Sequence, residues 1–184
     1  MHLKSLIKLD IKTPADLLYM RNYVMYNLYQ SLPTRNDFAD SKLIFQPPKK
    51  SLDLSTDVNY VILNKRDKSV KYILNVYKTA STYGQKVIDL EAYLYPMLLE
   101  YKKAKEKFSS NPSLFLNSDA TESLSRNRMS VIYSQLGKIV GKKLGTSLNR
   151  HQAVSETMPL EKMKKLAGKM GHSVQEAMDV YAKI

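Results

Sequence analysis

The spacing of the hydrophobic residues changes twice along this chain of 184 residues, and that change constrains the fold more than any other feature. From Thr13 to Ser31 apolar side chains recur at helical spacing, whereas between residues 58 and 90 they alternate with polar ones, which is the period of a β-strand. From residue 91 onward helical spacing returns. The pattern predicts a mostly helical α+β fold, in which a small sheet lies beside a helical bundle.

Start and stop signals delimit the predicted helices. Thr13 and Pro14 offer a capping hydroxyl and a proline in the first helical turn, and Pro33 follows the end of this helix near Ser31. The tyrosines of this helix are interpreted as core residues with polar tips at the surface. Further helices are expected over 91–108, from a cap at Asp119 or Thr121 to about Ile139, and over 146–158, 159–169 and 173–183.

Three short strands are expected over residues 58–62, 70–76 and 87–90. Polar turns over 64–68 and 79–84 separate them, so successive strands should pair as a three-stranded antiparallel meander. A sheet this small is not stable alone. Helices are therefore expected to pack on one of its faces.

Composition fits a single domain with a polyanionic partner. Hydrophobic residues make up 43% of the chain, which is enough for a buried core. The absence of cysteine excludes disulfides, Cys-ligated metals and cysteine nucleophiles, and a content of only three histidines argues against a His-rich metal site. The formal net charge of +12 favours nucleic acid or an anionic membrane surface as the partner.

Several familiar patterns do not occur in the sequence. No stretch approaches the roughly 18 apolar residues of a membrane span, and the N-terminus has no signal-peptide core, so we expect an intracellular protein that is not secreted. A glycine-rich phosphate loop, a His-Glu-x-x-His motif and a Gly-x-Ser-x-Gly elbow are likewise missing. Cations and a tyrosine remain, and these suffice for metal-free phosphoryl transfer, which mainly needs positive charge and positioning.

The C-terminal segment carries the most informative pattern. It contains Arg150, then the tetrapeptide 170–173 (Met-Gly-His-Ser), and then Tyr181, nine positions after His172. This order and spacing resemble the C-terminal signature of the tyrosine recombinases, also called the phage integrase family. In that family an arginine opens a helix, a Leu/Met-Gly-His-Ser turn follows, and a tyrosine stands nine residues after the histidine.

Two upstream positions agree with this resemblance. The family places a catalytic lysine in the hairpin of its sheet, and Lys78 stands at the matching position within Tyr-Lys-Thr. It places its first arginine just after a long helix, where this chain has Arg35, whereas Arg21 lies inside the helix and is the poorer match. The family's usual Gly-x-Arg turn is Pro-Thr-Arg here, with Asp37 and Asp40 as the nearby acids.

The chain departs from the family pattern at two places. The residue three positions before Arg150 is Ser147, where the family usually has a histidine, and a serine hydroxyl can donate to a phosphate oxygen but is no general base near neutral pH. Only three residues follow Tyr181, where many members have a further helix that docks on a neighbouring subunit.

The resemblance implies a catalytic domain spanning 1–184, with the family's N-terminal DNA-clamping domain absent because the chain is either truncated or unusually minimal. Its tyrosine nucleophile would cleave double-stranded DNA and form a 3′-phosphotyrosyl link, without metal, ATP or any other cofactor. The implied partners are DNA and further copies of the chain, as a tetramer on two duplexes or a monomer when alone. The abundance of Lys, Asn and Tyr would suit an AT-rich viral or mobile-element genome.

The resemblance also assigns roles to individual residues. Tyr181 is the nucleophile, Lys78 the general acid, and Arg35 and Arg150 hold the non-bridging phosphate oxygens. His172 donates to the phosphate, and Ser147 is a supporting donor. Lysines near the Arg150 helix are expected to contact the DNA backbone or to be solvated: Lys142, Lys143, Lys162, Lys164 and Lys165.

Each of these residues has a plainer interpretation when taken alone. Arg35 could be a solvated surface arginine, Lys78 could protect a sheet edge, and His172 could cap a helix. Tyr181 could be a core tyrosine. At the level of function, two alternatives stay open: a type IB topoisomerase with the same cleavage chemistry, and a non-catalytic basic DNA-binding module of the same fold.

Overall fold

A computed structural model describes residues 11–46, 54–139, 141, 144–146 and 168–169. Its elements in chain order are α2 (Pro14–Ser31), the 3-10 helix η1 (Asn36–Phe38), β1 (Ser41–Phe45), β2 (Asn59–Leu63), β3 (Val70–Leu74), α3 (Ala80–Tyr83), β4 (Lys86–Asp89), α4 (Leu94–Glu106) and α5 (Arg126–Ile139). This arrangement confirms a mixed fold of helices and one sheet. The helices expected over 146–158, 159–169 and 173–183 lie almost entirely outside the described residues.

The sheet has four strands in the order β1-β2-β3-β4, one more than predicted. The three expected strands form the antiparallel part, β2 to β4. The unexpected strand β1 pairs parallel with β2, with Ser41 opposite Asn59 and Phe45 opposite Leu63. The prediction missed β1 because five residues without a clear alternation carry little local signal, and its pairing partner is distant in the sequence.

The outer edge of β1 is covered by a loop. The Leu43 amide donates to the Pro112 carbonyl oxygen at 2.9 Å, and the Leu114 amide donates to the Ser41 carbonyl oxygen at 2.7 Å. These bonds satisfy backbone groups that an open edge would present to other chains. The loop thereby fixes β1, which follows directly on the turn that carries Arg35.

Helix α2 begins where the sequence predicts. The Thr13 hydroxyl accepts a bond from the Asp16 amide at 3.2 Å, and the Asp16 carboxylate accepts one from the Thr13 amide at 2.8 Å, which completes a capping box. These bonds also hold the pKa of Asp16 below its usual value. Of the four tyrosines on this helix, Tyr29 is buried as predicted, whereas Tyr19 is 72% exposed.

Helix α4 lies within the predicted range, but α5 begins later than predicted. Residues 119–125 do not extend it, because the side chain of Asn117 accepts bonds from the Thr121 and Glu122 amides and holds this stretch as a turn. Ala120 takes a positive φ of 57° in that turn, which is incompatible with a helix. Asp119 and Thr121 therefore do not cap a helix.

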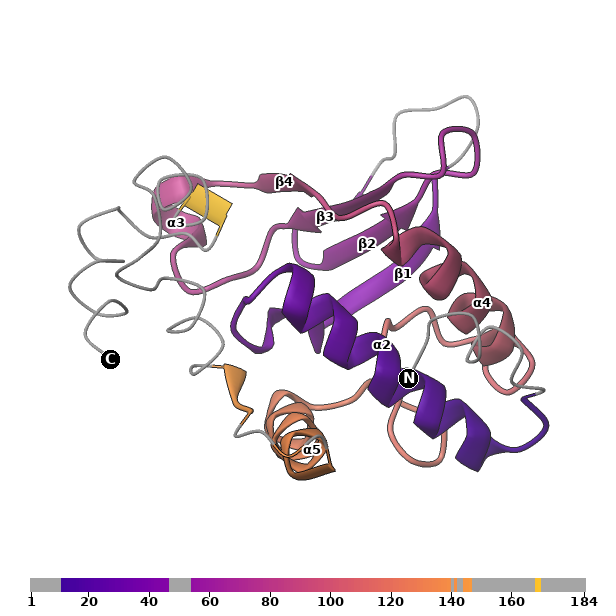
Figure 1. The fold of residues 1–184 in the computed structure, drawn as a ribbon. Helices are drawn as coiled ribbons and strands as arrows, with labels where there is room; N and C mark the ends of the chain where they lie inside the picture. The colour runs from indigo at the N-terminus through magenta and orange to yellow at the C-terminus, as the bar shows by residue number, and fades with distance from the viewer. Residues whose placement is uncertain (1–10, 47–53, 140, 142–143, 147–167, 170–184) are drawn as a thin grey trace.

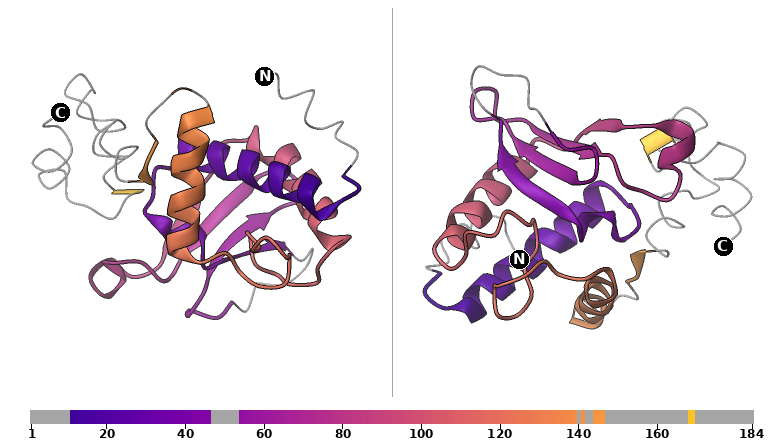
Figure 2. Two further views of the ribbon diagram at one scale, coloured as in Figure 1. Left: turned by 90° about the horizontal axis from the view of Figure 1, so that it is seen from below. Right: turned by 180° about the vertical axis from the view of Figure 1, so that it is seen from behind.

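The helices α2, α4 and α5 gather on one face of the sheet, with α2 between the other two (Figures 1 and 2). Aromatic residues connect these layers: Phe38 stacks on Tyr72 with ring centroids 4.7 Å apart, and Tyr29 contacts both Phe38 and Tyr133. This cluster lies directly beneath the turn between α2 and β1. That turn therefore rests on a packed core rather than on a mobile loop.

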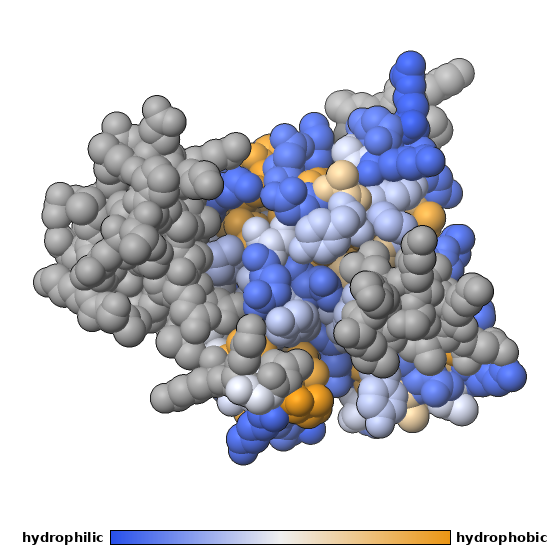
Figure 3. All heavy atoms as spheres, viewed as in Figure 1, coloured by the Kyte–Doolittle hydropathy of each residue, from blue (hydrophilic) through white to orange (hydrophobic). Residues whose placement is uncertain are grey.

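The outer surface of the described residues is largely hydrophilic on the face drawn in Figure 3, and its hydrophobic residues form small separate patches. None of the helices within the described ranges combines the length and apolar character that crossing a membrane would require.

Candidate functional site

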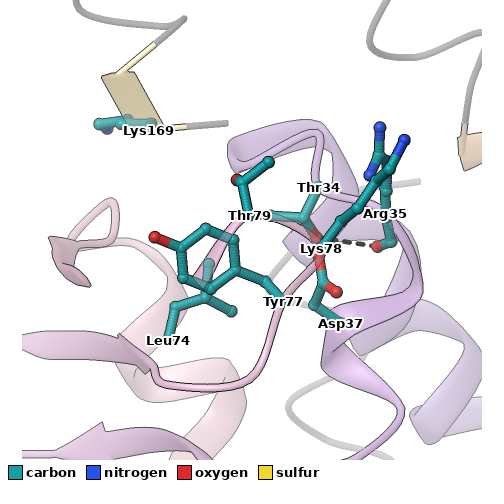
Figure 4. A pocket seen from close by; sticks show the side chains of 8 residues that line it. All are labelled: Thr34, Arg35, Asp37, Leu74, Tyr77, Lys78, Thr79 and Lys169. Carbon is teal, nitrogen blue, oxygen red and sulfur yellow. Dashed lines mark hydrogen bonds between the residues drawn. The ribbon is translucent and has the colours of Figure 1, made fainter. Parts of the chain in front are cut away.

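A pocket opens between the α2–β1 turn and the hairpin that joins β3 to β4 (Figure 4). Eight residues line it: Thr34, Arg35, Asp37, Leu74, Tyr77, Lys78, Thr79 and Lys169. The pocket therefore brings together the two described residues, Arg35 and Lys78, that the sequence marks as catalytic candidates.

The turn that carries Arg35 is bonded to two helices, α2 and α5. The hydroxyl of Tyr29, a residue of α2, donates to the Arg35 carbonyl oxygen at 3.1 Å. The hydroxyl of Thr34, which lies in the turn, donates to the same oxygen at 3.0 Å. The side-chain amide of Asn36 donates to the Ser130 hydroxyl of α5 at 2.6 Å. These bonds fix the turn, while the Arg35 side chain itself remains half-exposed.

Two acidic residues follow Arg35, and both face Arg126 at the start of α5. The Arg126 side chain donates to Asp40, and its Nη1 lies 4.0 Å from Oδ1 of Asp37. Burial disfavours the charge of Arg126, but the hydrogen bond and the charge of Asp40, with a smaller contribution from Asp37, outweigh burial and raise its pKa. Arg126 thus lies beside both carboxylates, and Asp37 also lines the pocket with Arg35.

Lys78 lies just beyond β3 in a hairpin with its own internal bonds. The Tyr77 hydroxyl donates to the Gly84 carbonyl oxygen at 2.8 Å, and the Gly84 amide donates to the Ala80 carbonyl oxygen at 2.8 Å. Gly84 has a φ of +65°, which a side chain would strain. The predicted turn over 79–84 contains the short helix α3, and Lys78 is exposed at its start.

The pocket lining carries more positive than negative charge, with three cationic side chains and one acidic side chain, Asp37. Figure 4 shows the side chains of Arg35 and Lys78 extending in the same direction from the two walls, with the ring of Tyr77 turned the other way. Lys169 adds a third cation to the lining. Like charges that share a pocket repel one another, and a bound phosphate would relieve that repulsion while accepting their hydrogen bonds.

A lysine on β4 connects the hairpin to residues 168–169. Lys86 Nζ donates to the Gly168 carbonyl oxygen at 2.6 Å and lies 5.4 Å and 5.1 Å from the ring centroids of Tyr77 and Tyr83. Burial lowers the pKa of Lys86. This contact places Lys169 at the pocket, and Figure 1 shows the segment beside α3.

The remaining site predictions fall outside the described residues: Ser147, Arg150, His172, Tyr181, Lys142, Lys143, Lys162, Lys164 and Lys165. The poorer arginine candidate, Arg21, lies away from the pocket, because it is buried and donates to the Leu116 carbonyl oxygen at 2.8 Å. Among the described residues, no group of three or more His, Asp or Glu side chains could hold a metal ion.

The sequence analysis did not single out Thr34 or Lys169. Thr34 is adjacent to Arg35, and its hydroxyl is one of many in the chain. Lys169 belongs to a lysine-rich stretch in which no spacing distinguishes one member from another. Only the folded structure identifies Thr34 and Lys169 as residues that line the pocket.

Comparison with solved structures found a similar fold. The crystal structure of XerA recombinase matches this chain with a TM-score of 0.60 and 14% sequence identity. The match covers 98% of this chain and 57% of that one, so the chain spans just over half the length of the structure that it resembles. No protein-family model and no curated protein sequence matches the chain.

Proposed function

We propose that residues 1–184 form a catalytic domain of the tyrosine recombinase or integrase type, which cleaves and rejoins double-stranded DNA. The observation that carries this proposal is the pocket shared by Arg35 and Lys78, on a fold similar to that of a recombinase. Both residues also match the family's catalytic positions in the sequence. Two independent lines of reasoning therefore meet at the same two side chains.

In the proposed reaction the phenolate oxygen of Tyr181 attacks a DNA phosphorus. A bond from phosphorus to the tyrosine oxygen forms as the bond to the 5′ oxygen breaks, and Lys78 gives its proton to that departing oxygen. The products are a 3′-phosphotyrosyl link and a free 5′-hydroxyl. Attack by a 5′-hydroxyl on the link reverses these steps and reseals a strand, so no nucleotide is consumed.

The other residues are proposed to stabilise charge on the phosphate. Arg35 and Arg150 would hold the non-bridging oxygens, for which the planar guanidinium is suited. His172 would add a donor, with Ser147 in a supporting role. Lys169 supports this arrangement, because it lines the pocket and precedes His172 by only three positions in the sequence.

DNA binding is proposed to extend beyond the pocket to the lysines at 142, 143, 162, 164 and 165. Contacts of this kind neutralise backbone phosphates without reading sequence, and they weaken steeply as salt concentration rises. The net charge of +12 supports such a contribution. Assembly of four copies on two duplexes is proposed for strand exchange.

A covalent-adduct assay tests the proposal. A nicked suicide duplex loses the short strand that carries the 5′-hydroxyl, so the protein–DNA link accumulates and is visible on a denaturing gel. We expect the wild type to form the adduct in the presence of a strong chelator and the Tyr181→Phe variant to form none. Lys71→Ala, which removes an exposed lysine of β3, is the matched control and should retain activity. Equal behaviour of wild type and Tyr181→Phe would refute the enzymatic role.

The role of Lys78 is tested with a substrate whose leaving 5′ oxygen is replaced by sulfur. A thiol is far more acidic than an alcohol, so a thiolate departs without a proton from the enzyme. On the oxygen substrate Lys78→Ala should cleave about 10²- to 10⁴-fold more slowly, which is the usual contribution of a general acid. On the sulfur substrate most of that loss should disappear. An equal loss on both substrates would contradict a role in proton transfer.

Two further assays, plasmid relaxation and DNA binding at varied salt concentration, separate the two alternative functions. A topoisomerase of type IB would relax any supercoiled plasmid, whereas a recombinase would exchange strands between defined sites. A non-catalytic module would bind duplex DNA with strong salt dependence but form no adduct.

A further inference from the structure

The side chain of Asn59 lies between the two walls of the pocket. It stands at the start of β2 and is fully buried, with 0% of its surface exposed. Its Nδ2 donates to the Val76 carbonyl oxygen at 2.9 Å and to the Asp37 carbonyl oxygen at 3.3 Å. Its Oδ1 accepts bonds from the Asn75 amide at 2.8 Å and the Val76 amide at 2.7 Å. Both donors and both acceptor positions of the carboxamide are therefore used.

These partners are adjacent to the two catalytic candidates. Val76 precedes Lys78 by two residues, and Asp37 follows Arg35 by two residues. The Asp37 carbonyl oxygen is held in addition by the Ser41 hydroxyl at 2.9 Å. One buried carboxamide thus connects the backbone of the Arg35 turn to the backbone that leads into the Lys78 hairpin.

The bonds of Asn59 also explain where β3 ends. The ladder between β2 and β3 runs from Leu63 opposite Val70 to Tyr60 opposite Ile73. Beyond it, the amides of Asn75 and Val76 donate to the side chain of Asn59 instead of to a strand. The carboxamide substitutes for a strand partner and lets the chain leave the sheet toward the pocket without a buried unpaired amide.

We propose that Asn59 is a positioning residue that sets the place of Lys78 relative to Arg35, and this inference rests on the proposed function. Its three bonds to Asn75 and Val76 are shorter than its bond to Asp37, so its effect falls mainly on the Lys78 wall. Neither Asp nor Leu reproduces the arrangement, because an aspartate lacks the two donors and a leucine lacks every polar atom. The proton transfer by Lys78 is the step that depends on Asn59.

The test measures cleavage by Asn59→Leu and Asn59→Ser on the oxygen and the sulfur substrates, per folded molecule. We expect a loss of about 10- to 100-fold on the oxygen substrate, the size that a misplaced catalytic group can cause. The loss should be much smaller on the sulfur substrate, and adding Asn59→Leu to Lys78→Ala should cause little further loss. Asn64→Ala is the matched control, because it removes a carboxamide in the turn just beyond the far end of the same strand.

A purely structural asparagine gives a different result. It would lower the stability of the fold and leave cleavage per folded molecule unchanged. That result, or an equal loss on both substrates that adds to the loss from Lys78→Ala, would overturn the inference while leaving the proposed function intact. A wild type that forms no adduct at all would overturn both. Should both variants fail to fold, hydrogen exchange in the wild type decides: the Asn75 and Val76 amides should be as protected as those of β3, and rapid exchange there contradicts the inference.

Discussion

Lys105 in α4 is a buried lysine whose environment predicts an unusual pH dependence of stability. The residue is 1% exposed, and its Nζ donates to the carbonyl oxygens of Asn111 at 2.6 Å and Ser113 at 2.7 Å. These partners are neutral. Burial, together with the nearby charge of Lys102, lowers the pKa of Lys105 to about 8 in spite of Glu106. The bonds fix the loop that covers the edge of β1.

The sign of the effect follows from proton binding. Between pH 8 and 10.5 the unfolded chain keeps the proton on Lys105 while the folded protein releases it, so stability rises with pH in that interval. A shift from 10.5 to about 8 corresponds to about 3 kcal/mol of destabilisation below pH 8, at 1.36 kcal/mol per unit. About 2 kcal/mol of this should be recovered between pH 7 and pH 9.5. Higher pH is avoided, because burial also raises the pKa of Tyr101 and its ionisation in the unfolded chain would lower stability there.

Urea denaturation of the wild type and Lys105→Met at pH 7, 8.5 and 9.5 measures the effect. Methionine has a similar length and no charge, so the variant should lack the part of the rise that Lys105 causes and be less stable than the wild type by about 2 kcal/mol more at pH 9.5 than at pH 7. Lys103→Met, which alters an exposed lysine of the same helix, should keep the rise. Burial lowers the pKa of Lys86 in all three proteins, so its contribution cancels. A wild-type stability that stays flat or falls over this interval would refute the reasoning, as would a full rise in Lys105→Met.

Three further predictions concern the pocket and its supports. Arg35→Lys, which keeps the charge but not the planar pair of donors, should slow adduct formation by about 10²-fold with little change in the urea midpoint; an unchanged rate contradicts its contact with the phosphate. Lys86→Met should speed hydrogen exchange at residues 168–169 more than in β3, because the Gly168 carbonyl loses its partner, whereas uniform exchange would show that the contact does not hold this segment. Thr13→Ala should lower the free energy of unfolding by about 1 kcal/mol in urea denaturation through loss of the helix cap, and an unchanged value contradicts the capping box.

Local patterns predicted much of this fold because helices and hairpins are largely local structures. The hydroxyl of Thr13 and the proline after it set the start of α2. The alternation over residues 58–90 predicted β2, β3 and β4, whose partners follow one another along the chain. The same alternation located the hairpin that carries Lys78, which the resemblance marked as a candidate. In each case the deciding interactions lie within a few residues.

Other features depended on contacts between distant segments. The strand β1 forms only because β2 and the 112–114 loop lie on either side of it. The late start of α5 follows from the turn around Asn117, where side-chain bonds compete with the helix. Neither feature has a hydrophobic period of its own, so no pattern in the sequence could announce it.

The candidate site divides in the same way. The sequence by itself determined which cations were available, and its resemblance to a known family marked Arg35 and Lys78 as candidates of one set. Only the tertiary structure decided that they share a pocket, that Lys169 joins them, and that Asn59 connects their backbones. The physical reason is that the sequence lists the charged side chains of a chain but not which of them lie close together. That proximity depends on packing between distant segments and on buried hydrogen bonds, which produce no periodic pattern in the sequence.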